Sequence, residues 1–161
     1  MTTSYDPNKT TERAFLEAIK YISYRPRTEH ETRTKLLKSN FQSKVVETTI
    51  TRCYENNLLN DHQFATLWVE SRSNSNPKSI FLIKRELMEK GINREISTAA
   101  TQSISDEQNI IKATHKKSRS IRHLSKDQFN KKLTNHLLRK GFNIHLIQKV
   151  TCEAWTNRNN N

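Results

Sequence analysis

Glycine and proline are scarce in this sequence, and their scarcity excludes two kinds of site and one fold class. Only two glycines occur in 161 residues, Gly91 and Gly141, and they lie far apart in the chain. A P-loop and a G-x-G-x-x-G loop both need several glycines close together, so that backbone N–H groups can approach phosphate. Nucleotide binding of these two kinds is therefore excluded. Three prolines and two glycines also provide few of the tight turns that an all-β protein requires.

Long apolar runs and cysteine motifs are missing as well. The longest apolar run, from Ile80 to Ile83, is far shorter than the about 20 residues that span a bilayer, and no signal segment opens the chain. Cys53 and Cys152 form neither a Cys-x-x-Cys motif nor a disulfide framework, which is typical of a reducing compartment. We therefore expect a soluble, cytoplasmic protein with no membrane partner, in which both cysteines are small core residues.

Acidic residues are scarce in the last third of the chain, which gives this part a strong positive charge. The net charge is +12; residues 108–161 hold 12 Lys+Arg against 2 Asp+Glu, whereas residues 1–107 hold 16 against 14. No acid occurs between Gln108 and Lys126. The basic residues of that stretch are Lys112, Lys116, Lys117, Arg119, Arg122 and Lys126, together with His115 and His123. Such a cluster favours a polyanion or an acidic protein surface as partner, and a solvated helix face is the alternative interpretation.

An internal repeat of about fifty residues organises the chain. Apolar residues recur three and four positions apart, and no long stretch alternates with a period of two, which predicts helices throughout. The three corresponding segments are Lys35–Phe41, Arg85–Ile92 and Asn135–Phe142. Each segment has a residue that tolerates a left-handed backbone, Asn40, Gly91 or Gly141, where a helix should end.

Capping residues predict three helices in each repeat. Thr28 with Glu31 and Ser125 with Gln128 have the spacing of a capping box. Further N-cap candidates are Gln42 or Ser43, Asn60, Ser79, Asn93 and Asn143. We therefore predict an all-α fold of three tandem three-helix repeats that form an elongated, curved array of either hand. The expected repeats are residues 13–60, 61–105 and 106–155, flanked by disordered tails at 1–12 and 156–161.

Three sequence motifs resemble the RecX family of recombination regulators. They are Arg25–Phe41 (RPRTEHETRTKLLKSNF), Asn57–Arg72 (NLLNDHQFATLWVESR) and Ile83–Ile92 (IKRELMEKGI). The similarity extends in order from Arg13 to Val150. Its most specific part is the end of the second motif, from Phe64 to Arg72. The chain departs from the family pattern at turns and caps, since Asn40 and Asn57 stand where Gly is usual, and Asn60 where Asp is usual.

The resemblance implies a function as well as a fold. Members of the family are bacterial proteins of three tandem three-helix repeats that bind RecA and its filaments on single-stranded DNA. They suppress strand exchange, ATP hydrolysis and co-protease activity. The resemblance therefore implies a regulator of homologous recombination and of the SOS response, whose partner is the RecA protein and its filament, with DNA itself as a further partner to consider.

Nine basic residues are candidates for binding the RecA filament or DNA. They are Arg25, Arg27, Arg72, Lys112, Lys116, Lys117, Arg119, Arg122 and Lys126. The first three also have a structural interpretation. Arg25 and Arg27 flank a proline in a link where side chains project freely, yet Glu29 and Glu31 are near enough to neutralise them. Arg72 could pack its stem on an aromatic ring one turn earlier or pair with an acid.

An aromatic stripe precedes Arg72. Phe64, Leu67 and Trp68 lie at helical spacing on one side of a predicted helix. A platform for stacking bases is one interpretation of such residues. We instead expect all three to belong to the core, because large apolar side chains on one helix face are usually buried.

No catalytic or metal-binding pattern is visible in the sequence. An active site needs a nucleophile with its base, paired acids or a metal cluster. The only adjacent acidic pair, Asp106-Glu107, stands at a predicted helix start, where carboxylates complement the helix dipole. None of the six histidines has a second His or Cys at metal-binding spacing. We therefore expect a monomeric regulator that is not an enzyme and has no cofactor or metal; the alternative is a stand-alone nucleic-acid-binding protein of the helix-turn-helix type.

Overall fold

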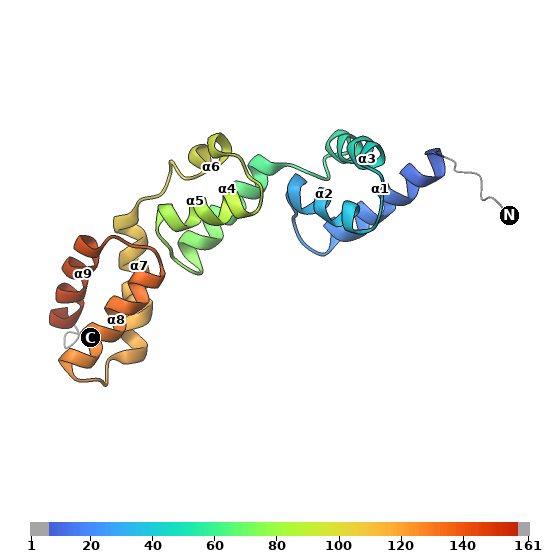
Figure 1. Cartoon of the computed structure of the whole chain (residues 1–161). Helices are drawn as coiled ribbons and strands as arrows, with labels where there is room; N and C mark the ends of the chain where they lie inside the picture. The colour runs from blue at the N-terminus through green and yellow to red at the C-terminus, as the bar shows by residue number, and fades with distance from the viewer. Residues whose placement is uncertain (1–6, 158–161) are drawn as a thin grey trace.

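The computed structural model describes residues 7–157, and these residues form nine helices and no strand. The helices are α1 (Pro7–Ser23), α2 (Glu29–Lys38), α3 (Ser43–Glu55), α4 (Asp61–Asn74), α5 (Ile80–Glu89), α6 (Arg94–Ala100), α7 (Asp106–Ile121), α8 (Lys126–Arg139) and α9 (Ile144–Thr156). Figure 1 shows three groups of three helices that follow one another along a curved row. The predicted all-α fold of three tandem repeats is confirmed. We name the groups unit 1 (α1–α3), unit 2 (α4–α6) and unit 3 (α7–α9).

Each unit has a hydrophobic core of its own. The second helix of every unit places one leucine at its centre, and Leu36, Leu87 and Leu137 are each fully buried. These leucines occupy the corresponding positions of the sequence repeat, so the repeat in sequence is a repeat in packing. No helix within residues 7–157 is both long enough and apolar enough to cross a membrane.

The predicted helix ends are confirmed in all three units. Asn40, Gly91 and Gly141 have φ values of +62°, +82° and +81°, in the left-handed region. The N–H of the next residue then donates to the carbonyl of the buried leucine, over 3.0 to 3.3 Å. Asn57, after α3, also has a positive φ of +55°.

Most of the predicted N-caps are confirmed, but two of them form no capping hydrogen bond through the side chain. Thr28 and Glu31 form the expected capping box of α2. Side chains also cap the helices that follow Asn60, Ser79, Asn93 and Asn143. Gln42 precedes α3 without a capping hydrogen bond from its side chain. The predicted capping box of Ser125 and Gln128 does not form, and the Ser125 side chain accepts no capping hydrogen bond. Both residues are exposed, so water can satisfy the first N–H groups of α8 instead.

The first helix begins earlier than predicted. α1 starts at Pro7, so residues 7–12 are helical and the predicted tail at 1–12 is wrong there. A contact with another helix explains the difference, because the Glu12 carboxylate pairs with Arg52 of α3 at 2.6 Å. Residues 1–6 of the predicted tail lie outside the described residues.

Helix α9 also differs from the prediction. It continues through Thr156, the first residue of the predicted tail, and the edge of the Trp155 ring packs against Phe129 with centroids 5.4 Å apart. Cys53 is fully buried, as expected, but Cys152 is exposed, because the buried stripe of α9 lies on the other side of the helix. Residues 158–161 lie outside the described residues.

The first junction between units joins the N-terminus of α2 to the C-terminus of α5. Thr28 Oγ1 donates to the carbonyl of Lys90 at 2.7 Å, and the N–H of Glu29 donates to Asp61 Oδ1 at 3.0 Å. The Lys90 ammonium reaches back to the Glu31 carboxylate at 3.3 Å. Burial raises the pKa of Asp61, although the backbone hydrogen bond from Glu29 opposes that shift.

The second junction repeats this arrangement one unit later. The N–H of Ser79 donates to the carbonyl of Lys140 at 3.0 Å, and the N–H of Ile80 donates to Asp106 Oδ1 at 2.7 Å. The N-terminus of α5 therefore lies on the C-terminus of α8, just as α2 lies on α5. Corresponding residues join each pair of units, although the donor to the helix-end carbonyl is the Thr28 hydroxyl at the first junction and the Ser79 N–H at the second. The chain therefore extends in one direction, which explains the elongated row in Figure 1.

The junctions give both glycines a second role besides ending a helix. A Cβ atom at Gly91 would lie 2.1 Å from the Cβ of His30, and one at Gly141 would lie 2.6 Å from Ser79 Oγ. Both distances are too short for a side chain of any kind. Asn40 stands at the corresponding position of unit 1 and carries a Cβ. Unit 1 therefore packs closely over Gly91 and unit 2 over Gly141, and the missing side chain makes each close approach possible.

Candidate partner-binding surface

Arg25 and Arg27, predicted to bind the partner, lie on the same acid of unit 1. Arg25 Nη2 is 2.8 Å from Glu31 Oε1, and Arg27 Nη1 is 3.9 Å from the same oxygen. Glu29 does not take part, because it pairs with Arg33 at 2.7 Å. The interpretation that an acid pairs with these arginines is confirmed for Glu31, which offsets part of their charge and also pairs with Lys90. Arg25 keeps 43% of its side chain exposed and Arg27 only 15%.

Arg72 is held in a similar way within unit 2. Its Nε donates to Glu86 at 2.8 Å, and its guanidinium lies 4.1 Å from the centroid of the Trp68 ring. Lys78 also pairs with Glu86, and Trp68 Nε1 donates to the same carboxylate at 3.0 Å. Burial alone would raise the pKa of Glu86, but the hydrogen bonds from Lys78, Arg72 and Trp68 outweigh it and hold this pKa below its usual range. The predicted pairing of Arg72 with an acid is thus confirmed, and it is the guanidinium of Arg72 that lies on the predicted aromatic ring.

The aromatic stripe of α4 is only partly in the core. Phe64 is buried, and Trp68 is half-buried and stacks on it with ring centroids 5.7 Å apart. Leu67 is 47% exposed, so its predicted place in the core is wrong. The buried side of α4 passes through Ala65 and Val69, and Leu67 projects away from it.

Four of the remaining candidates form a basic face on unit 3. We use this name for Lys112, Lys116, Arg119 and Arg122, which are all exposed and follow one another along one side of α7 and its C-cap. Lys112 Nζ donates to Asn74 Oδ1 at 3.2 Å, and Lys116 Nζ donates to the carbonyl of Ser75 at 2.9 Å. Both acceptors are neutral, so these hydrogen bonds do not offset the positive charges of Lys112 and Lys116. Among the described residues none of the four forms an ion pair.

The last two candidates lie apart from the basic face. Lys117 is half-buried and belongs to a different side of α7, where it faces His136 and Lys140 of α8 across a small cavity. Lys126 is exposed at the first position of α8. The structure therefore brings four of the nine predicted residues together on one exposed surface and places the other five elsewhere.

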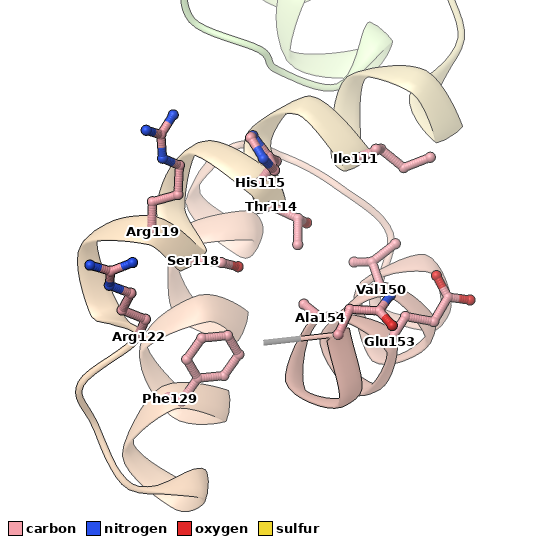
Figure 2. Close-up of a pocket in the computed structure, with 11 residues that line it drawn as sticks. Ile111, Thr114, His115, Ser118, Arg119, Arg122, Phe129, Val150, Glu153 and Ala154 are labelled. Carbon is pink, nitrogen blue, oxygen red and sulfur yellow. The ribbon is translucent and has the colours of Figure 1, made fainter. Parts of the chain in front are cut away.

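An apolar cavity of about 270 Å³ lies beside the basic face, between α7 and α9. Its apolar lining consists of Ile111, Phe129, Val150 and Ala154. Figure 2 shows Arg119 and Arg122 on the α7 side of this cavity and Glu153 on α9 opposite them. The hydroxyls of Thr114 and Ser118, also in the lining, are buried without a hydrogen-bond partner in the described part of the chain. An apolar group of a partner can enter here while the arginines attract a neighbouring negative charge.

The sequence contains one sign of this cavity that its motifs did not reveal. Ile110 and Ile111 are adjacent in a mostly polar helix. Successive residues of a helix point about 100° apart, so the two isoleucines face different directions. Ile110 is fully buried and Ile111 is 60% exposed at the edge of the cavity. The lining residues Phe129, Val150 and Ala154 come from α8 and α9, which no local motif connects to α7.

Comparison with known proteins agrees with the repeat architecture. The family models described as the first, second and third three-helix domains of RecX match residues 14–53, 60–100 and 105–151. Proteins named Regulatory protein RecX from Bacillus cytotoxicus and Bacillus cereus are each 33% identical to this chain over 144 residues, which cover 88% of this chain and 53% of the relative. The chain thus spans about half the length of the curated relatives it matches.

Solved structures of RecX proteins are similar to this chain along most of its length. The crystal structure of RecX from Lactobacillus salivarius has a TM-score of 0.74 and 25% identity, and the similarity covers 91% of this chain and 97% of that one. A second structure, described as the regulatory protein RecX, has a TM-score of 0.72 and 23% identity over 87% of this chain and 72% of its own. With all three family domains matched in order and the same fold, this chain belongs to the RecX family of regulatory proteins.

Proposed function

We propose that this chain regulates homologous recombination and the SOS response by binding RecA and its filaments on single-stranded DNA. Bound there, it inhibits strand exchange, ATP hydrolysis and co-protease activity without being an enzyme itself. Family membership supports the choice of partner. The observation that carries the proposal within this chain is the basic face of unit 3, which forms no ion pair within residues 7–157 and lies directly beside an apolar cavity.

The shape of the chain supports inhibition through many contacts rather than through one pocket. Three units in a curved row present an extended surface, with each unit displaced along the row from the one before (Figure 1). A protein of this shape can contact more than one subunit of a filament. Inhibition is then steric and conformational, because the subunits of the filament can move only after the bound chain has shifted or dissociated.

The charges assign different tasks to the units. Arg25, Arg27 and Arg72 pair with Glu31 and Glu86, which also pair with Lys90 and Lys78, so these acids offset part of the positive charge of units 1 and 2 and hold the arginine side chains in place. The basic face keeps its charge and therefore supplies most of the long-range attraction. Unit 3 accordingly steers the protein to an acidic surface, while units 1 and 2 supply much of the shape-specific docking.

RecA-driven ATP hydrolysis on single-stranded DNA tests this division. We would change Lys112, Arg119 and Arg122 to Gln and titrate the variant at several salt concentrations. Three exposed contacts of about 0.5 kcal/mol each predict an about tenfold higher concentration for half-inhibition at low salt. The difference should shrink as the Debye length falls from about 30 Å at 0.01 M to about 8 Å at 0.15 M.

A matched variant in unit 1 is the control. Lys20, Lys38 and Lys44 are also exposed, and their replacement by Gln removes the same charge far from the basic face. This control should inhibit as the parent does. If the two triple variants lose inhibition equally, or neither does at any salt concentration, the basic face is only a solvated helix surface. Equal binding to bare single-stranded DNA and to RecA-coated DNA would instead favour the stand-alone nucleic-acid-binding protein.

A further inference from the structure

A second cavity, of about 200 Å³, lies at the junction between units 2 and 3. We call it the junction cavity. Its lining comes from both units: Asn76 and Pro77 in the link from α4 to α5, Ala113, Lys116 and Lys117 on α7, and His136 and Lys140 on α8. A water molecule takes about 30 Å³ of liquid, so this space is large enough for a small polyatomic ion with its remaining water.

Positive groups converge on the junction cavity without an acid in its lining. Three of its lining residues are lysines and a fourth is a histidine. Glu86 is an acid close enough to raise the pKa of Lys140, but its carboxylate already accepts from Arg72 and Lys78. The positive charge of the cavity is therefore not compensated by the residues that form it.

The protonation equilibria show that these groups repel one another. Burial lowers the pKa of Lys140, and the neighbouring charges of Lys78, Lys116 and Arg72 lower it further. Burial likewise lowers the pKa of His136, which Lys140, Lys117 and Arg139 also depress. Cations held together in a partly desolvated space raise the free energy of the folded state. A bound anion would reverse the sign of that contribution.

The cavity also has hydrogen-bond donors to spare. Lys116 Nζ gives one bond, to the carbonyl of Ser75, and Lys140 Nζ donates to Asn76 Oδ1. An ammonium has three N–H donors, so each lysine keeps others for a ligand. Several ammonium groups around one small space suit the oxygens of a phosphate, which lysine binds as a point charge, whereas a planar carboxylate is better matched by the fork of arginine.

We propose that the junction cavity is a phosphate-binding site, in which Lys116, Lys117 and Lys140 hold the phosphate group between units 2 and 3. Because its lining includes the α4–α5 link of unit 2 as well as α7 and α8 of unit 3, the bound phosphate fixes the two units relative to each other. The site shares Lys116 with the basic face, but the test below needs no RecA and changes no residue of that face, so its failure and that of the function proposed above are distinguishable. The phosphate can belong to a nucleic-acid backbone or to a small phosphate compound, and these two sources are separable by experiment.

Thermal unfolding of the full chain tests the site without RecA. Circular dichroism would follow the melting temperature in potassium phosphate and in potassium chloride of equal ionic strength and pH. At a phosphate concentration ten times the dissociation constant, the parent should melt roughly 3 to 6 °C higher than in chloride. Lys140→Gln and Lys117→Gln should lose at least half of this gain. In chloride neither variant should melt lower than the parent, since each removes a repelling charge.

Lys131→Gln is the matched control, because Lys131 is an exposed lysine of α8 outside the lining. It should keep the full gain in phosphate. The same melts with pyrophosphate and with a twelve-residue oligothymidylate lacking a terminal phosphate distinguish the two sources. A gain that depends on Lys117 and Lys140 with either probe supports the site and assigns the source. Equal gains in the parent and both cavity variants, or no gain with any of the three probes, would overturn the proposal.

Discussion

Replacing Gly91 by asparagine should separate the two reasons for a glycine at that position. Asparagine already adopts the left-handed conformation in this chain, at Asn40 with a φ of +62°, so the change keeps the backbone conformation at little cost. The new Cβ, however, would lie 2.1 Å from the Cβ of His30. Neither atom can move away by rotation of a side chain. The junction between units 1 and 2 must therefore open.

The magnitude follows from the contacts that the opening disturbs. Overpacking of a tight contact costs about 1 to 3 kcal/mol. Weakening the hydrogen bond from Thr28 to the Lys90 carbonyl adds about 1 kcal/mol. We expect Gly91→Asn to lower the free energy of unfolding by roughly 2 to 4 kcal/mol. Gly141→Asn should cost less, because the contact nearest its Cβ would be the Ser79 hydroxyl at 2.6 Å, which can rotate away, and the Cβ of Leu82 would lie farther off, at 3.0 Å.

Urea unfolding followed by circular dichroism at the helical band is the assay, with small-angle scattering to detect a changed angle between units. Asn40→Gly provides the reciprocal control at the end of α2, where both residues fit the left-handed backbone. It should change the free energy of unfolding by less than about 1 kcal/mol. If Gly91→Asn is as mild as Asn40→Gly, close approach at the junction does not require glycine and the reasoning is refuted.

Three further predictions concern single side chains. Glu86→Gln should destabilise by about 1 to 2 kcal/mol at pH 7 in urea unfolding. The pKa of Glu86 is lowered on folding, so its contribution is present above the usual value of about 4.3 and is lost as pH falls through the folded-state pKa; the difference between parent and variant should vanish in acid. Ellman's reagent should modify Cys152 in the native protein and Cys53 only after unfolding, since burial also raises the pKa of Cys53. Ile111→Asp should leave stability unchanged, because Ile111 is 60% exposed, yet weaken inhibition of RecA-driven ATP hydrolysis several-fold; unchanged inhibition would exclude the apolar cavity from docking.

The parts of the fold that could be predicted are those that nearby residues determine. A helix end needs only a residue that accepts a positive φ, and a capping box needs two residues three apart, so the ends at Asn40 and Gly91 and the cap at Thr28 followed from sequence. The Ser125 box failed under the same rule, because an exposed helix start can be satisfied by water instead.

The parts that could not be predicted depend on contacts between distant segments. Arg72 meets Glu86 from another helix, and only that contact shows that its charge is already matched. Arg119 forms no ion pair with any residue that the structure describes, yet it looks the same in sequence. The apolar cavity and the junction cavity each combine segments that are separated in the chain by a whole helix or more. Composition therefore showed that unit 3 is positively charged, but not that its charges are divided between the basic face and the junction cavity.

The position after each second helix holds more information than its role as a helix stop suggests. A left-handed backbone is compatible with Asn or Gly, and by that criterion alone Asn40 and Gly141 are equivalent. They differ in what lies against them: another unit packs over Gly141, with Ser79 Oγ 2.6 Å from where a Cβ would be. Within this chain, glycine at that position therefore marks a helix end that bears a junction. In this chain, the N-terminus of the second helix of one unit packs on the C-terminus of the second helix of the following unit. Once the three repeats are aligned, the glycines therefore indicate the direction in which the units pack.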